Sequence, residues 1–121
     1  MPTAVQRLTT IEQVDELLRQ SAAHAVLVFK HSLTCGTSAQ ALDELADHLD
    51  RANGPHAHYA LVTVQTHRDV STAIATRLGI RHETPQALLV MDGRVVWSAS
   101  HFRVTADAIA KAIESHQGAA R

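Results

Sequence analysis

A short apolar run, followed by the only cysteine of the chain and then by a helical pattern, constrains this fold more than any other stretch. Residues 25–30 read Ala-Val-Leu-Val-Phe-Lys, which is typical of a buried parallel strand. Apolar side chains at Leu42, Leu45 and Leu49 then recur at helical spacing. Cys35 is therefore expected in a strand-to-helix turn, at the carboxyl end of a strand, where open α/β sheets bind their ligands.

Such a turn favours an ionised sulfur. The first turn of a helix presents unpaired N–H groups and the positive end of the helix dipole, and both stabilise an anion. A free cysteine has a pKa of about 8.5, and a helix N-terminus can lower it to roughly 3.5–7.5. We therefore expect Cys35 to be a reactive thiolate at neutral pH. The alternative is an unreactive, buried cysteine that serves only in packing.

The remaining patterns predict the element order α-β-α-β-α-β-β-α. A capping box at Thr9 or Thr10 begins a helix that ends near residues 21–23. The further predicted elements are a helix over 37–51, a strand over 57–65, a helix capped by Asp69 and ended by Gly79, strands over 86–91 and 94–99 joined by a hairpin at Asp92-Gly93, and a helix over 105–116 before a frayed end at 118–121.

Composition and charge exclude several classes of protein. The 121 residues are expected to form a single domain over residues 1–121. The net charge of −1 argues against nucleic acid or an anionic membrane as the main partner. No apolar run reaches the roughly 18 residues of a membrane span, and the N-terminus lacks the apolar core of a signal peptide. Because one cysteine cannot form an internal disulfide, we expect a reducing, cytoplasmic location.

Three blocks of the sequence stand out together. They are Phe29-Lys30-His31-Ser32-x-Thr34-Cys35, Gly79-Ile80-Arg81-His82-Glu83-Thr84-Pro85-Gln86-Ala87-Leu88 and Asp92-Gly93-x-Val95-Val96-Trp97-x-Ala99-Ser100-His101. With these blocks the chain resembles the monothiol bacilliredoxin family of YtxJ-like proteins. The likeness covers most of residues 10–115. It implies a thioredoxin-like three-layer α/β sandwich, in which helices flank a central, mixed, four-stranded sheet.

The resemblance also implies an activity. Family members are thought to remove bacillithiol, a low-molecular-weight thiol, from S-bacillithiolated proteins by thiol-disulfide exchange. The expected partners are S-thiolated client proteins and bacillithiol as co-substrate, with no bound cofactor, no nucleic acid and no membrane. A dithiol relative would carry a second cysteine where this chain has Ser38, so a second thiol must release the intermediate.

Two other functions remain open. Cys35-Gly36-Thr37-Ser38 also resembles the Cys-Gly-x-Ser motif of monothiol glutaredoxins, which bind glutathione and often share a [2Fe–2S] cluster. The third possibility is a binding module that keeps the fold without the chemistry.

The family resemblance also implies a cis peptide bond before Pro85, which would leave the N–H and C=O of Thr84 free to pair with the backbone of a bound thiol.

The predicted site therefore has Cys35 as its nucleophile. The residues expected to stabilise the thiolate or bind substrate are Thr34, Gly36, Thr37, Ser38, Thr84, Pro85 and His31. Ser38 is either a hydrogen-bond donor to the sulfur or a capping residue, and the two threonines are turn residues or donors. Nine histidines invite a metal interpretation, but none of the usual zinc spacings occurs, and we expect no metal.

Overall fold

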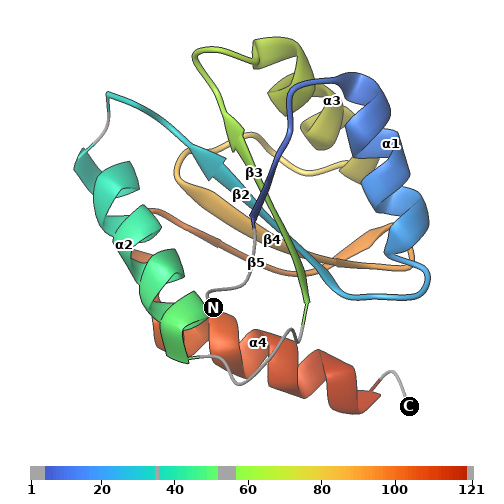
Figure 1. The fold of residues 1–121 in the computed structure, drawn as a ribbon, viewed down its shortest axis with the longest axis vertical. Helices are drawn as coiled ribbons and strands as arrows, with labels where there is room; N and C mark the ends of the chain where they lie inside the picture. The colour runs from blue at the N-terminus through green and yellow to red at the C-terminus, as the bar shows by residue number, and fades with distance from the viewer. Residues whose placement is uncertain (1–4, 35, 52–56, 120–121) are drawn as a thin grey trace.

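The computed structural model is built around one twisted sheet with helices on both faces (Figure 1). It describes residues 5–34, 36–51 and 57–119. The five strands lie in the order β1-β3-β2-β4-β5. β2 pairs in parallel with β3 and antiparallel with β4, so the sheet is mixed. This is the three-layer α/β sandwich that was expected.

The elements follow the predicted order, with two additions. They are β1 (Val5–Arg7), α1 (Ile11–Gln20), β2 (Val26–His31), α2 (Gly36–Arg51), β3 (His58–Thr63), α3 (Arg68–Leu78), β4 (Gln86–Met91), β5 (Arg94–Ser100), η1 (His101–Arg103) and α4 (Ala106–Ala119). The four-stranded sheet was wrong by one strand, because β1 is only three residues long and pairs in parallel with the outer side of β3. A strand that short has no periodicity to read.

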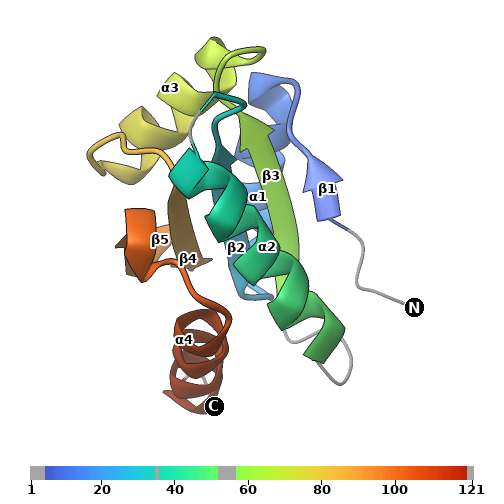
Figure 2. The same cartoon turned by 90° about the vertical axis from the view of Figure 1, so that its left-hand side faces the viewer.

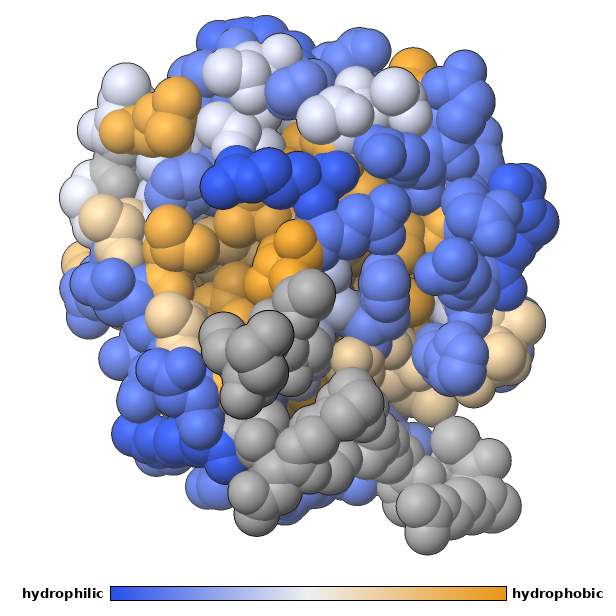
Figure 3. All heavy atoms as spheres, viewed as in Figure 1, coloured by the Kyte–Doolittle hydropathy of each residue, from blue (hydrophilic) through white to orange (hydrophobic). Residues whose placement is uncertain are grey.

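Two separate cores lie on the two faces of the sheet. Alternate residues of β2 serve different faces: Leu27 and Phe29 pack in the cluster beneath α2 and α4, whereas Val26 and Val28 pack beneath α1 and α3. Figure 2 shows α2 and α4 together on one side, and α1 and α3 also contact each other. Near the middle of the face drawn in Figure 3, apolar residues gather between α2 and β1, with polar residues around them.

Local sequence signals explain most of the element ends. Thr10 caps α1 in a capping box with Gln13, as predicted. Gly79 ends α3 in the left-handed conformation, with φ of 61°. The Asp92-Gly93 turn has positive φ at both residues, which is the type I′ hairpin expected of this dipeptide.

Two predicted ends were wrong. His67, and not Asp69, is the N-cap of α3, so Asp69 lies in its first turn, where its charge still complements the helix dipole. α4 continues to Ala119 in place of fraying from residue 118, while residues 120–121 lie outside the described part of the chain. Within the described residues, no helix is both long and apolar enough to cross a membrane.

Candidate active site around the β2–α2 turn

The two segments flanking Cys35 lie as the sequence predicts. β2 ends at His31, and α2 begins at Gly36, the residue after the cysteine. Cys35 itself lies outside the described residues, so the site is built from its neighbours. The start of a 16-residue helix directly after the cysteine places unpaired N–H groups and the positive end of the helix dipole at this turn.

Gln65, in the turn two residues after the end of β3, holds the loop before the cysteine. Its Oε1 accepts from the N–H of Leu33 at 3.0 Å, and its Nε2 donates to Ser32 Oγ at 2.7 Å. A longer bond of 3.3 Å runs from the same Nε2 to Thr34 Oγ1. One side chain thus fixes three consecutive residues. Sequence reasoning missed this role, although polar side chains after neighbouring parallel strands meet at one edge of a sheet.

Ser38 is fully buried in the first turns of α2. Its Oγ accepts a hydrogen bond of 2.8 Å from the N–H of Ser32 and lies 3.1 Å from His31 Nδ1. The Ser32 bond ties the helix back to the end of β2. If Nδ1 of His31 is unprotonated, the Ser38 hydroxyl donates its proton to that nitrogen. If Nδ1 carries the proton, His31 is the donor, and the Ser38 hydroxyl can donate to another acceptor.

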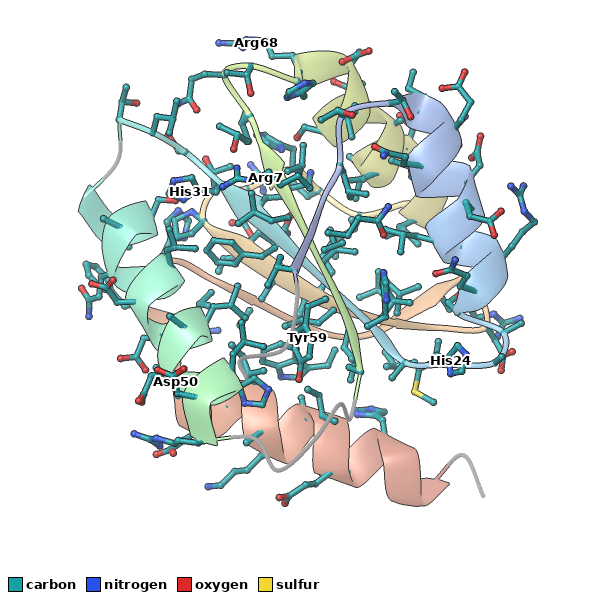
Figure 4. The ribbon with its side chains drawn as sticks, in the orientation of Figure 1. Arg7, His24, His31, Asp50, Tyr59 and Arg68 are labelled. Atoms are coloured by element: carbon teal, nitrogen blue, oxygen red, sulfur yellow. The ribbon has the colours of Figure 1, made fainter. Side chains whose placement is uncertain are left out.

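His31 is uncharged at neutral pH. Its ring stacks on Phe29, with centroids 6.1 Å apart. Burial, and then the nearby Arg7 charge, lower the pKa of His31 below its usual 6.5. Figure 4 shows the Arg7 side chain extending from β1 toward His31. Arg7 is therefore the charge that acts on His31, and sequence reasoning did not identify it because β1 was not foreseen.

The other described residues of the turn are less buried than Ser38. Thr34 and Gly36 are exposed and Thr37 is half-buried. Nothing lies within 4 Å of where a Cβ on Gly36 would be, so this glycine is not required by close packing. Thr34 donates its N–H to Ser32 Oγ at 3.4 Å, as a turn residue would. Leu33 is an exposed apolar residue, with 64% of its surface accessible.

The loop before β4 forms the other side of the site. The Thr84–Pro85 peptide bond is cis, as the resemblance implied. Lys30 pairs with Gln86 across β2 and β4, so the register places Pro85 beside the end of β2. Within the described residues, neither the N–H nor the C=O of Thr84 makes a hydrogen bond. An incoming backbone could pair with both groups, as an added strand does.

No group of three or more possible metal ligands occurs among the residues that the structure describes. The histidines are dispersed. His48 Nε2 is hydrogen-bonded to the hydroxyl of Tyr59 at 2.8 Å, and His58 to Gln6 at 2.9 Å. Burial raises the pKa of Tyr59 to about 12, so the phenol stays protonated. These two hydrogen-bonded pairs are structural contacts that lie away from the cysteine turn.

The comparisons with known proteins agree with this geometry. The family model for monothiol bacilliredoxin BrxC matches residues 6–109. The chain belongs to the monothiol bacilliredoxin family. A solved structure described as a candidate oxidoreductase with a thioredoxin fold is 31% identical, with a TM-score of 0.77 over 89% of this chain and 92% of that chain. Family and fold together make this chain a thiol oxidoreductase.

More distant structures share the fold alone. A thioredoxin from Malassezia sympodialis is 18% identical, with a TM-score of 0.71 over 96% of this chain and 94% of that one. A reduced Schistosoma mansoni thioredoxin pre-protein is 13% identical, with a TM-score of 0.71 over 93% of this chain and 98% of that one. This chain and these thioredoxins therefore share a fold at low sequence identity.

Proposed function

We propose that this protein removes bacillithiol from S-bacillithiolated client proteins in the cytoplasm, with Cys35 as the nucleophile. The observation that carries the proposal is the backbone of Thr84, which makes no hydrogen bond to any described residue and lies beside the end of the strand leading to the cysteine. A substrate held there by two backbone hydrogen bonds would present its disulfide to the turn between β2 and α2. Membership of the monothiol bacilliredoxin family supports bacillithiol as the thiol that is transferred.

The reaction proceeds in two exchanges. The Cys35 thiolate attacks the bacillithiol sulfur of the mixed disulfide, so the client leaves as a thiolate and takes up a proton. Cys35 is then joined to bacillithiol by a disulfide. Because Ser38 stands where a resolving cysteine would be needed, a second bacillithiol attacks this bond. It releases bacillithiol disulfide and the Cys35 thiolate. In the net reaction the client sulfur is reduced to a thiol, and the sulfur of the second bacillithiol is oxidised to the disulfide level.

The chain's own residues prepare the first step. The α2 N-terminus favours the negative sulfur, and the Gln65 and Ser38 hydrogen bonds hold the preceding loop in place. No bound cofactor is needed, since bacillithiol acts as co-substrate. The exposed Leu33 offers an apolar contact to the client protein beside the cysteine.

Intact mass spectrometry tests this proposal. The reduced protein is mixed with an S-bacillithiolated client, and we expect one bacillithiol adduct on Cys35 together with loss of bacillithiol from the client. Cys35→Ser is the control and should take up nothing. A client that keeps its bacillithiol in the presence of the reduced protein would contradict the proposed function.

A further inference from the structure

A fully buried lysine lies one residue before the end of β2. Lys30 has 0% of its surface exposed, and no carboxylate of the described residues forms an ion pair with it. Burial lowers its pKa to about 8, so the amine still carries a proton at pH 7. An unpaired buried charge is unfavourable for folding. A hydrophobic side chain would fill this site at less cost, so Lys30 calls for another explanation than stability.

The ammonium of Lys30 binds the loop before β4. Its Nζ lies 3.0 Å from His82 Nδ1. An ammonium has no lone pair and can only donate, so His82 must accept at an unprotonated Nδ1. The same Nδ1 lies 3.4 Å from Ser71 Oγ on α3. His82 is three residues before Pro85, so this bond connects the strand that leads to the cysteine with the loop containing Thr84.

Other hydrogen bonds hold this loop from different sides. Gln86 Nε2 donates to the C=O of Arg81 at 3.1 Å, and Ser100 Oγ donates to Glu83 Oε2 at 2.6 Å. Of the side-chain hydrogen bonds of residues 81–85 in the described chain, the bond from Lys30 alone reaches β2. Gln86 pairs across from Lys30, and its Oε1 is buried without a hydrogen-bond partner. Apart from the backbone pairing of β4 with β2, the described part of the loop is thus held to β2 through one charged side-chain donor.

We propose that Lys30 is a positioning residue for disulfide exchange: its hydrogen bond to His82 holds residues 82–85, and with them the backbone of Thr84, against the end of β2. The effect on reaction rate rests on the proposed function, whereas the hydrogen bond itself does not. When the bond is lost, Pro85 is still held by the bond from the His101 N–H and by the β4 ladder beside it, but the part of the loop before Thr84 loses its side-chain attachment to β2. Displacing a substrate-orienting group in this way commonly slows a reaction by roughly ten- to a hundred-fold.

Protonation of His82 breaks this bond. An imidazolium carries N–H at both nitrogens, so it cannot accept from the ammonium, and the two positive charges repel. Burial, followed by the charges of Lys30 and Arg68, lowers the pKa of His82 below its usual 6.5. The carboxylate of Glu83 acts in the opposite direction. The bond is therefore intact at neutral pH and is lost in acid.

Exchange kinetics test the role of Lys30. The rate with an S-bacillithiolated peptide is measured from pH 5 to 8 and divided by the thiolate fraction, obtained from absorbance near 240 nm. We expect Lys30→Met to slow the normalised reaction about tenfold or more at pH 7, whereas the exposed-lysine control Lys111→Met leaves it unchanged. The wild-type rate should fall in acid, and His82→Asn, which accepts without titrating, should abolish that fall.

Two results would overturn the inference: Lys30→Met exchanging at the wild-type rate, or His82→Asn keeping the acid fall. A second measurement separates this inference from the proposed function. The His82 ring is titrated by NMR in a Cys35→Ser background, where we expect its pKa to rise toward 6.5 when Lys30 is replaced by Met. If the wild-type protein has no exchange activity, the proposed function is refuted. The titration still decides whether Lys30 binds His82, because an unchanged His82 pKa in Lys30→Met excludes the bond.

Discussion

Replacing Lys30 by methionine should make the protein more stable at neutral pH. Burial lowers the pKa of Lys30 from 10.5 to about 8. This difference corresponds to about 3 kcal/mol against the charged form in the folded state. Methionine has a similar length and no charge to bury, but it loses the hydrogen bond to His82, which is worth about 1 kcal/mol. The expected net gain in the free energy of unfolding at pH 7 is about 2 kcal/mol.

The same pKa fixes the pH dependence of stability. The unfolded chain keeps the Lys30 proton up to pH 10.5, whereas the folded chain releases it above about 8. The unfolded state therefore binds more protons between these values, so wild-type stability rises with pH in this window. Of the 3 kcal/mol penalty, about 2 should be relieved between pH 7 and 9.5. Measurements should stop below pH 10, because the raised pKa of Tyr59 lowers stability above that value.

Urea unfolding followed by circular dichroism provides the assay. Both proteins carry Cys35→Ser, so that titration of the thiol does not contribute, and Lys111→Met serves as the matched control. The gap between Lys30→Met and the wild type should be largest at pH 7 and should shrink toward pH 9.5. A Lys30→Met protein less stable than the wild type at pH 7, or a gap that does not change with pH, would refute the reasoning.

Three further substitutions test the contacts around the site. Gln65→Ala removes three hydrogen bonds from the loop before Cys35, and we expect exchange to slow several-fold in a stopped-flow assay with little change in the free energy of unfolding. An exchange rate equal to that of the wild type would show that the loop keeps its conformation without Gln65. Ser38→Ala leaves the buried N–H of Ser32 without its acceptor and should lower the free energy of unfolding in urea by about 1–3 kcal/mol, and no loss would mean that water replaces the hydroxyl. Tyr59→Phe removes the hydroxyl bonded to His48, for an expected loss of about 1 kcal/mol by the same method, and an unchanged midpoint would show that this bond adds nothing to stability.

Most of the fold could be predicted because its signals are local. The apolar run of β2, the capping box at Thr10, Gly79 at the end of α3 and the Asp92-Gly93 turn each act through neighbours in sequence. β1 was not predicted, because its three residues gain their strand conformation only from pairing with β3. Propensity alone does not reveal a short edge strand of this kind.

The site was only partly predictable, because some of its residues are brought together by tertiary contacts and not by neighbours in sequence. The turn between strand and helix is a local feature, and the cis bond at Pro85 could be predicted only from the family resemblance. Arg7 lies in β1 and Gln65 in the turn after β3, both distant in sequence from the cysteine, and no local motif marks them. The burial of Lys30 could have been inferred from alternation, since it shares a face with Val26 and Val28. Its partner His82 could not, because a loop supplies it.

A direct competition between two thiols tests the central claim best. The reduced protein is offered equal amounts of a client modified with bacillithiol and the same client modified with glutathione, and intact mass is followed over time. The account predicts that the mass of bacillithiol appears first and predominantly on Cys35, while the bacillithiolated client becomes a free thiol. A protein that gains no adduct, or that gains glutathione in preference, would contradict it.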